Sequence, residues 1–201
     1  MKNKAYIVAS GDRSRLDFVP APDDFVIAVD GGYDYLLGGG IRIDLLVGDM
    51  DSIKHVPENI EKIVLEREKD DTDTLAAVKI GIAQGYEEFH IYCGTGGRLS
   101  HTVANIQTLE FLAKQKKRGF LFSENGTATV IRNEKRIFSG TGLLSIFSLS
   151  PETTVTTKGL KYPLKNQPLA SDFPLGISNE FTGAEAKITA HDGSLLIVYD
   201  E

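Results

Sequence analysis

The chain has 201 residues, of which 41% are hydrophobic and 25% charged, a composition typical of a globular protein with a buried core. Its net charge of −6 argues against broad nucleic-acid binding, and no apolar stretch approaches the roughly 20 residues of a membrane-spanning helix. A single cysteine, Cys93, excludes an intramolecular disulfide, and the first apolar run is too short for a signal peptide. We therefore expect a cytoplasmic protein whose partners include neither nucleic acid nor membrane.

Residues 1–123 are expected to form a doubly wound α/β domain with a mostly parallel sheet, because short apolar runs alternate with helical patterns. The runs are continuous, as buried parallel strands tend to be, and occupy residues 5–10, 25–30, 44–49, 62–66, 89–94 and 120–123. Helical periodicity marks residues 72–85 and 100–117. The apolar side chains expected to face the core are Leu75, Val78 and Ile82 in the first helix and Val103, Ile106, Leu109 and Ala113 in the second.

Residues 124–201 have a different sequence pattern, in which turn residues separate strand-like segments and no long helical pattern occurs. These segments occupy residues 127–133, 135–140, 143–150, 153–159, 186–193 and 194–200. His191, Asp192 and Gly193 resemble a hairpin turn between the last two. The pattern predicts a smaller all-β, sandwich-like domain.

Acids and glycines gather where the strands of the first domain are predicted to end. Twelve of the 15 aspartates lie within residues 1–73. The segments concerned are residues 30–32, 48–51, 69–73 and 94–98. Because open α/β sheets bind ligands beyond the carboxyl ends of their strands, we expect these segments to converge on one edge.

A metal and phosphate site is the chemical interpretation of that edge. Clustered carboxylates repel one another unless a cation lies between them, and Mg²⁺ takes a few carboxylate oxygens together with substrate phosphates. The glycine-rich loop before the second helix offers backbone N–H groups, and Arg98 offers a fork-shaped donor for phosphate. The Walker A pattern is absent, which excludes an ordinary P-loop enzyme. Taken singly, each segment is also typical of a turn or a helix cap; their combination favours phosphoryl chemistry on a nucleotide.

Four motifs follow one another along this edge: DGG at residues 30–32, GDMDS at 48–52, KDDTD at 69–73 and GTGGRLSH at 94–101. In this order they resemble the motifs of the thiamine pyrophosphokinase (thiamine diphosphokinase) family. In the second half, GLKYPL at residues 159–164 and GISNEF at 176–181 are similar to the substrate-side motifs of that family. The chain departs from the family at Ser100, where an acid often precedes the histidine.

The resemblance implies a role for each matching residue. Mg²⁺ would be held by Asp30, Asp49, Asp51 and Asp70. Asp70 or Asp73 would act as the catalytic carboxylate that orients the acceptor hydroxyl or takes its proton. The nucleotide would be bound by Thr72, Gly96, Gly97, Arg98 and His101. Thiamine would be contacted by Tyr162, Ser178 and Asn179.

The implied reaction moves a diphosphate group from ATP, the co-substrate, to the hydroxyl of thiamine, leaving AMP, with Mg²⁺ as cofactor. Members of the family act as homodimers, with thiamine at the subunit interface. The domain of residues 1–123 would then bind nucleotide and Mg²⁺, and that of residues 124–201 would bind thiamine.

Other functions stay open: a related pyrophosphokinase acting on a hydroxymethyl pterin, a metal-dependent phosphohydrolase, or a nucleotide-binding regulator without turnover. The GISNEF motif and Tyr162 favour thiamine over a pterin. The number of acids at the predicted edge argues against a pure binder.

Overall fold

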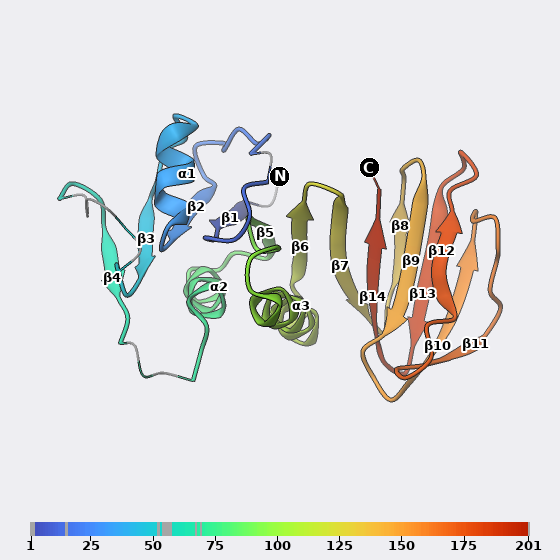
Figure 1. Cartoon of the computed structure of the whole chain (residues 1–201). Coiled ribbons are helices and arrows are strands. Elements are labelled where there is room, and N and C mark those ends of the chain that lie inside the picture. The colour runs from blue at the N-terminus through green and yellow to red at the C-terminus, as the bar shows by residue number, and fades with distance from the viewer. Residues whose placement is uncertain are drawn as a thin grey trace. The chain divides into compact units, whose positions relative to one another are not determined.

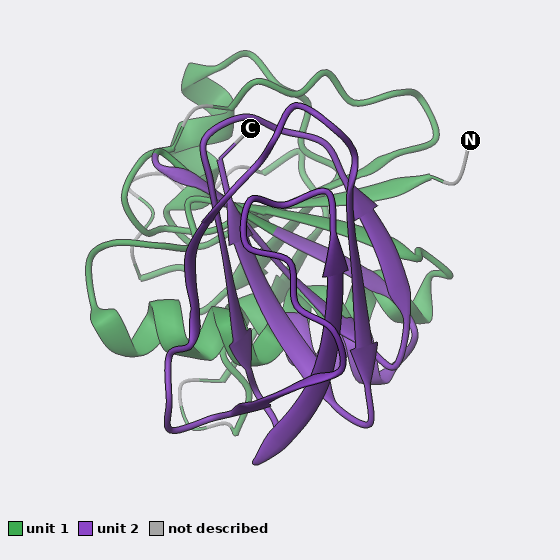
Figure 2. Cartoon of the chain, turned by 90° about the vertical axis from the view of Figure 1, so that its right-hand side faces the viewer, with its two compact units in different colours: residues 1–108, 121–124 green, residues 109–120, 125–201 purple. Residues whose placement is uncertain are grey.

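The computed structural model describes residues 3–14, 16–51, 53, 58–66, 68 and 70–200. The chain forms two compact units, which are coloured separately in Figure 2. The first, which we call the α/β unit, comprises residues 1–108 and 121–124, and the second, the β unit, comprises residues 109–120 and 125–201. The division passes through helix α3 (Leu99–Lys114) and strand β6 (Arg118–Ser123).

The α/β unit is built on a parallel sheet with the strand order β5-β1-β2-β3-β4 (Figure 1). Its strands are β1 (Lys4–Val8), β2 (Phe25–Val29), β3 (Leu45–Gly48), β4 (Lys62–Val64) and β5 (Glu88–Tyr92). All of these were predicted from the continuous apolar runs. Strand β1 pairs with β2 on one side and β5 on the other, so strand order reverses there and a ligand crevice is expected at its carboxyl end.

Helices cover both faces of this sheet. Helix α1 (Gly32–Gly38) was not predicted, because its glycine-bounded sequence GYDYLLG has low helix propensity. Its Tyr33 and Leu36 pack with Tyr6, Val8 and Val26. Helix α2 (Asp73–Ala83) lies on the opposite face, where a Cβ added to Gly81 would approach the ring of Phe89 to 2.7 Å.

The predicted core faces of two helices differ from those observed. In α2 the buried residues are Thr74, Ala77, Val78 and Gly81, whereas Leu75 and Ile82 are half-buried. Small side chains therefore face the sheet and let the helix approach it closely. In α3, Val103 is 49% exposed, which contradicts its predicted core position, whereas Leu109 is buried as expected and Asn105 is buried as well.

The β unit contains two antiparallel sheets around one core. The strands of the first, in spatial order, are β7 (Gly126–Arg132), β14 (Ser194–Tyr199), β9 (Leu143–Ser148) and β12 (Gly176–Glu180). Those of the second are β11 (Gln167–Ala170), β10 (Glu152–Lys158), β13 (Ala186–His191) and β8 (Lys135–Phe138). Side chains from both sheets form a single apolar cluster that includes Ile131, Phe138, Ile146, Val155 and Ile188. The predicted fold class, a doubly wound α/β domain followed by an all-β sandwich, is confirmed.

One predicted connection is wrong. The turn at Asp192 and Gly193 was expected to join two paired strands, yet β13 pairs with β10 and β8, whereas β14 pairs with β7 and β9. The turn therefore links the two sheets of the sandwich. A tight-turn signal reports a change of chain direction, and it does not report which strands exchange hydrogen bonds.

In the described part of the chain, no helix combines the length and the apolar character needed to cross a bilayer.

Candidate active site

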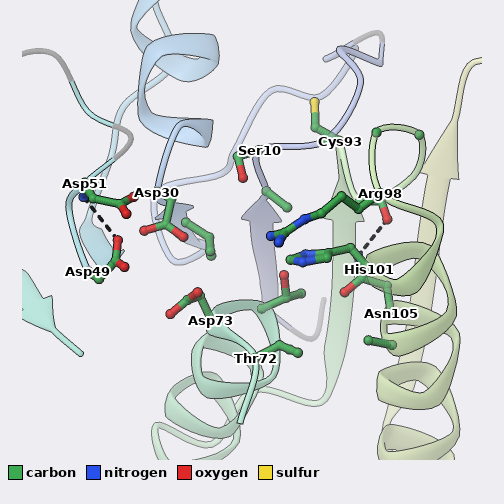
Figure 3. A pocket seen from close by; sticks show the side chains of 18 residues that line it. Ser10, Asp30, Asp49, Asp51, Thr72, Asp73, Cys93, Arg98, His101 and Asn105 are labelled. Carbon is green, nitrogen blue, oxygen red and sulfur yellow. Dashed lines mark hydrogen bonds between the residues drawn. The ribbon is translucent and has the colours of Figure 1, made fainter. Parts of the chain in front are cut away.

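A pocket of about 410 Å³ lies at the carboxyl edge of the parallel sheet. It is lined by residues that follow β1, β2, β3 and β5 and by residues at the starts of α2 and α3 (Figure 3). The four segments predicted to converge all contribute to it. Of the residues assigned by resemblance, those that line it are Asp30, Asp49, Asp51, Thr72, Asp73, Gly96, Gly97, Arg98 and His101. Asp70 is exposed and is not among the lining residues, and Ser52 and Lys69, from two of the motifs, lie outside the described residues.

Carboxylates dominate one part of the pocket. Asp30 follows β2, Asp49 and Asp51 follow β3, and Asp73 opens α2 (Figure 3). Oδ1 of Asp49 accepts a hydrogen bond from the backbone N–H of Asp51 at 3.1 Å, an Asx turn that fixes the two acids relative to each other.

Asp30 is the most perturbed of these carboxylates. Burial, followed by the charges of Asp73 and Asp49, raises its pKa to about 7. Its Oδ1 is buried and has no hydrogen-bond partner among the described residues. A buried carboxylate oxygen that has no hydrogen-bond donor from the protein is a suitable ligand for a bound cation.

The backbone is strained at these strand ends. Asp30, Met50 and Cys93 have positive φ angles of 47°, 64° and 53°, a conformation that L-residues rarely adopt. Gly48 is required beside them, since a Cβ at this position would overlap the carboxylate of Asp30. Strain of this kind persists where the surrounding structure imposes it, often at functional sites.

The described carboxylates of the pocket do not by themselves provide a complete set of ligands for a metal ion. Among the described residues, no three histidine, cysteine or acidic side chains lie close enough together to hold a metal ion by themselves. An ion bound here would need ligands from water or from a substrate. Mg²⁺, which usually keeps waters and substrate phosphates, meets this condition better than a structural metal does.

Basic and amide groups line another part of the pocket. The side chains of Arg98 and His101, which come from the loop before α3 and its first turn, extend into the pocket (Figure 3). Both residues are exposed to solvent, as a group that receives a ligand must be. Gly96 and Gly97 before them have positive φ angles of 73° and 55°. This loop therefore places the cation of Arg98 and backbone N–H groups at the positive end of a helix.

Asp12 anchors that loop and was missed in the sequence. Its Oδ1 accepts the backbone N–H of Gly97 at 3.1 Å, and its own N–H donates to the carbonyl of Thr95 at 2.9 Å. Gly97 thus uses its N–H within the protein. The signal was present, since the motif SGDR follows the first strand just as other acidic motifs follow later strands.

Asn105 is a second residue that sequence analysis missed. Its side chain is buried in α3, and its Nδ2 donates to the carbonyl of Gly94 at 2.6 Å (Figure 3). This bond ties the helix to the beginning of the glycine-rich loop. Near it, Ser14 Oγ accepts the N–H of Cys93 at 3.0 Å.

The residues assigned to thiamine lie in the β unit. Tyr162 is 57% exposed, and Ser178 has a positive φ of 55° at an irregularity in the pairing of β12 with β9. Asn179 is buried, with Oδ1 accepting the N–H of Tyr162 at 3.0 Å and Nδ2 donating to its carbonyl at 2.7 Å. Asn179 therefore fixes the backbone that carries the Tyr162 ring.

Two family models match the chain in series. The catalytic domain of thiamin pyrophosphokinase matches residues 20–121, and the vitamin B1 binding domain of thiamin pyrophosphokinase matches residues 129–195. The chain belongs to the thiamin pyrophosphokinase family. It is thereby an enzyme of the transferase class, and the resemblance drawn from its motifs is confirmed.

Relatives in the thiamin pyrophosphokinase family share the length and the fold of this chain. It is 28% identical over 210 residues to the thiamine pyrophosphokinase of Bacillus subtilis (strain 168), with 96% of each covered. The crystal structure of the thiamine pyrophosphokinase from Bacillus subtilis matches with a TM-score of 0.87 at 24% identity, covering 99% of this chain and 100% of that one. A thiamin pyrophosphokinase family protein from Enterococcus faecalis matches with a TM-score of 0.84 at 25% identity, covering 99% of both chains.

Proposed function

We propose that this chain transfers a diphosphate group from ATP to the hydroxyl of thiamine, yielding thiamine diphosphate and AMP. The observation that carries the proposal is that one pocket is lined both by the carboxylates of Asp30, Asp49, Asp51 and Asp73 and by the side chains of Arg98 and His101. Such a combination of carboxylates, an arginine and a glycine-rich loop suits phosphoryl transfer. The family supports the choice of acceptor, since one of its two matched parts is a vitamin B1 binding domain.

The nucleotide phosphates are assigned to the loop before α3. Arg98 can donate two hydrogen bonds to one phosphate, and His101 lies one helical turn further on in the same pocket. Thr72 and Gly96 line the pocket as well. Because the N–H of Gly97 is engaged by Asp12, we expect Gly97 to act through its backbone conformation and not as a direct donor.

Mg²⁺ is assigned to Asp30, Asp49 and Asp51. The buried Oδ1 of Asp30 without a protein partner and the raised pKa of this group both fit a bound cation. When bound, Mg²⁺ would offset the negative charge of the phosphates. Asp70, which does not line the pocket, is the weakest of the four predicted ligands.

In the proposed reaction the hydroxyl oxygen of thiamine forms a bond to the β-phosphorus of ATP. The bond between that phosphorus and the oxygen bridging to the α-phosphorus breaks, and AMP leaves with the electron pair. Asp73 is better placed than Asp70 to orient the hydroxyl and take its proton, since it lines the pocket at the start of α2. Arg98 would neutralise charge on the transferring group.

Thiamine is assigned to Tyr162 and Ser178 of the β unit, with the buried Asn179 positioning Tyr162 through its backbone. The thiazolium ring is a cation, and the face of an exposed tyrosine attracts cations. The Tyr162 ring has Lys161 Nζ at 5.4 Å from its centroid, and Lys161 in turn pairs with Glu180 at 2.8 Å. From the family resemblance we infer a homodimer with thiamine at the subunit interface. Leu175 and Ile177, which are close to Ser178 in the chain, are exposed apolar side chains that a second subunit would bury.

The direct test is ³¹P NMR of the purified chain with ATP, Mg²⁺ and thiamine. We expect AMP and thiamine diphosphate to appear together, and neither to appear when thiamine is omitted. Release of ADP and phosphate would identify a hydrolase instead. Turnover with a hydroxymethyl pterin but not with thiamine would move the activity to the alternative acceptor, and no turnover with either would overturn the proposal.

A further inference from the structure

A second pocket, in the β unit, is lined mainly by basic residues. Its volume is about 380 Å³, and we call it the basic pocket. The lining residues are Ala113, Lys114, Lys116, Lys117, Arg118, Arg132, Asn133, Glu134 and Arg136. Six of these are lysine or arginine and one is acidic, although the whole chain carries a net charge of −6. The basic pocket shares no residue with the pocket of the α/β unit.

Three segments supply these cations. The end of α3 and the turn after it supply Lys114, Lys116 and Lys117, the start of β6 supplies Arg118, and the adjoining ends of β7 and β8 supply Arg132 and Arg136. Lysines near the C-terminal end of a helix interact favourably with the negative end of the helix dipole, which explains the lysines that follow α3. The helix dipole does not explain the arginines that approach from β6, β7 and β8.

Two of the arginines are held in place by hydrogen bonds. Nη1 of Arg136 donates to Oγ1 of Thr129 at 3.0 Å, and that hydroxyl, which is fully buried, donates to the carbonyl of Gly119 at 2.6 Å. Nη1 of Arg132 donates to Oγ of Ser194 at 2.9 Å. Fixed guanidinium groups lose less conformational entropy on binding an anion than free side chains do.

The basic pocket contains a largely buried cation, Arg136, that its surroundings only partly stabilise. Burial lowers the pKa of Arg136, the ion pair with Glu134 acts in the opposite direction, and the neighbouring Arg118 lowers it by a smaller amount. An arginine stays protonated despite such a shift, so its burial remains as an energetic cost. A bound anion would remove that cost and gain charge-assisted hydrogen bonds.

The lining chemistry selects among anions. Aromatic side chains, on which bases of single-stranded nucleic acid stack, are absent from the residues that line the basic pocket. The negative charge of the whole chain also disfavours a long polyanion. Several cations around a small concave site match an anion that is compact and carries several charges.

We propose that the basic pocket binds a small oligophosphate, meaning an anion with two or more linked phosphate groups, free or at the end of an organic molecule. Lys116 and Arg132 approach this anion from the turn after α3 and from the end of β7. Binding here is separate from the transfer reaction proposed for the α/β unit and does not depend on it.

The test uses sodium tripolyphosphate and the ¹⁵N-labelled full chain in EDTA, which removes divalent cations from the other pocket. We expect saturable shifts of amide resonances in residues 113–118 and 132–136. Shifts confined to residues 94–101, or no saturable shifts, would overturn the proposal. Because this map is made on the unaltered chain, it stands even where a variant fails to fold.

Calorimetry compares the tripolyphosphate affinity of a basic-pocket variant with that of a matched control variant. Lys116→Gln combined with Arg132→Gln should weaken tripolyphosphate binding by about tenfold or more, since two charge-assisted contacts are removed. The control, Lys62→Gln combined with Lys165→Gln, removes the same charge from exposed positions outside the pocket and should change affinity by less than about threefold. Equal weakening in both double variants would show a general charge effect and overturn the proposal.

The source of the phosphate chain is resolved by competition. Pyrophosphate, ATP and thiamine diphosphate are compared as competitors of tripolyphosphate in EDTA. Displacement by any of these at similar concentration supports the proposal and identifies the organic part that is tolerated. Tighter binding of a 12-nucleotide single-stranded DNA than of tripolyphosphate would replace the small anion with nucleic acid and overturn it.

Discussion

Asp30 shows how single residues determine the chemistry of the pocket. Its left-handed backbone, with φ at 47°, directs the carboxylate toward the space left by Gly48, which has no side chain. Burial there and the nearby Asp73 and Asp49 raise its pKa to about 7. Such a group binds a proton near neutral pH unless a cation takes its place.

The pKa of Asp30 leads to a prediction about pH. The folded-state pKa lies above the unfolded value of 3.8, so this group contributes stability that is present below about pH 4 and lost as pH rises through 7. In EDTA, Asp30→Asn should therefore stabilise the fold more at pH 8 than at pH 6, relative to the unaltered chain. Thermal melts at both pH values measure this, and an equal effect at both would contradict the raised pKa.

The same proton competes with a cation. Mg²⁺ affinity of the unaltered chain should consequently increase from pH 6 to pH 8, as calorimetry can show.

Asp51 carries a second prediction at the level of single residues. Asp51→Asn should lower diphosphate transfer by roughly a hundredfold or more, because it removes a charge from the proposed Mg²⁺ site. The matched control is Asp71→Asn in the KDDTD motif, since Asp71 pairs with Lys79 at 2.6 Å and does not line the pocket. The control should keep nearly full activity, and thermal melts should show both variants folded. An active Asp51→Asn variant with unchanged Mg²⁺ dependence would remove Asp51 from the metal site.

At the scale of elements, the pocket depends on where α2 and α3 begin. Thr72 is the N-cap of α2, with Oγ1 accepting the N–H of Leu75 at 3.2 Å. Asn105 ties α3 to the end of β5 through the carbonyl of Gly94. Each helix start thus holds a residue that lines the pocket, Asp73 in one case and His101 in the other.

The cap of α2 can be tested alone. Thr72→Ala should lower the free energy of unfolding by about 1 kcal/mol, because the N–H of Leu75 loses its acceptor. Thr72→Ser keeps the hydroxyl and should change it by a few tenths of a kcal/mol at most. Urea unfolding curves of both variants decide this, and equal losses for Ala and Ser would show that the methyl group of Thr72 matters and not its hydrogen bond.

A helix or strand could be predicted only where its own residues carry a recognisable pattern. The strands of the parallel sheet were found because each is a continuous apolar run, and α2 and α3 because their periodicity is long enough. Helix α1 has only seven residues, and β11 and β12 contain proline, glycine and polar residues, so none of them has a local pattern. The exposed Val103 shows that apolar spacing alone does not identify the buried face of a helix.

At the scale of the whole molecule, the β unit exposes several large apolar side chains. Tyr162, Phe173, Leu175 and Ile177 are between 48% and 64% exposed. Single exposed apolar side chains are ordinary, whereas a group within one short part of the chain suits contact with another molecule. A second copy of the chain is the partner that the family resemblance predicts.

Dimerisation gives the last prediction. Light scattering should find twice the mass of one chain, and Ile177→Glu should shift the population toward the monomer, because a charge would be buried at the interface. Leu37→Glu is the control, since Leu37 is 61% exposed on α1 in the other unit and should have no such effect. A monomeric unaltered chain with full transfer activity would contradict the dimer.

The sequence by itself determined the alternation of strands and helices, the later β-rich half and the motifs that belong to one family. These features are local, since burial periodicity and turn chemistry are set by neighbours along the chain. Only the tertiary structure decided that Asp12 anchors the loop of Arg98, that Asp70 stays outside the pocket and that Asn179 orients Tyr162. It alone also brought the cations of the basic pocket together from α3, β6, β7 and β8. Such contacts join residues far apart in the chain, and their partners follow from packing that no local pattern encodes.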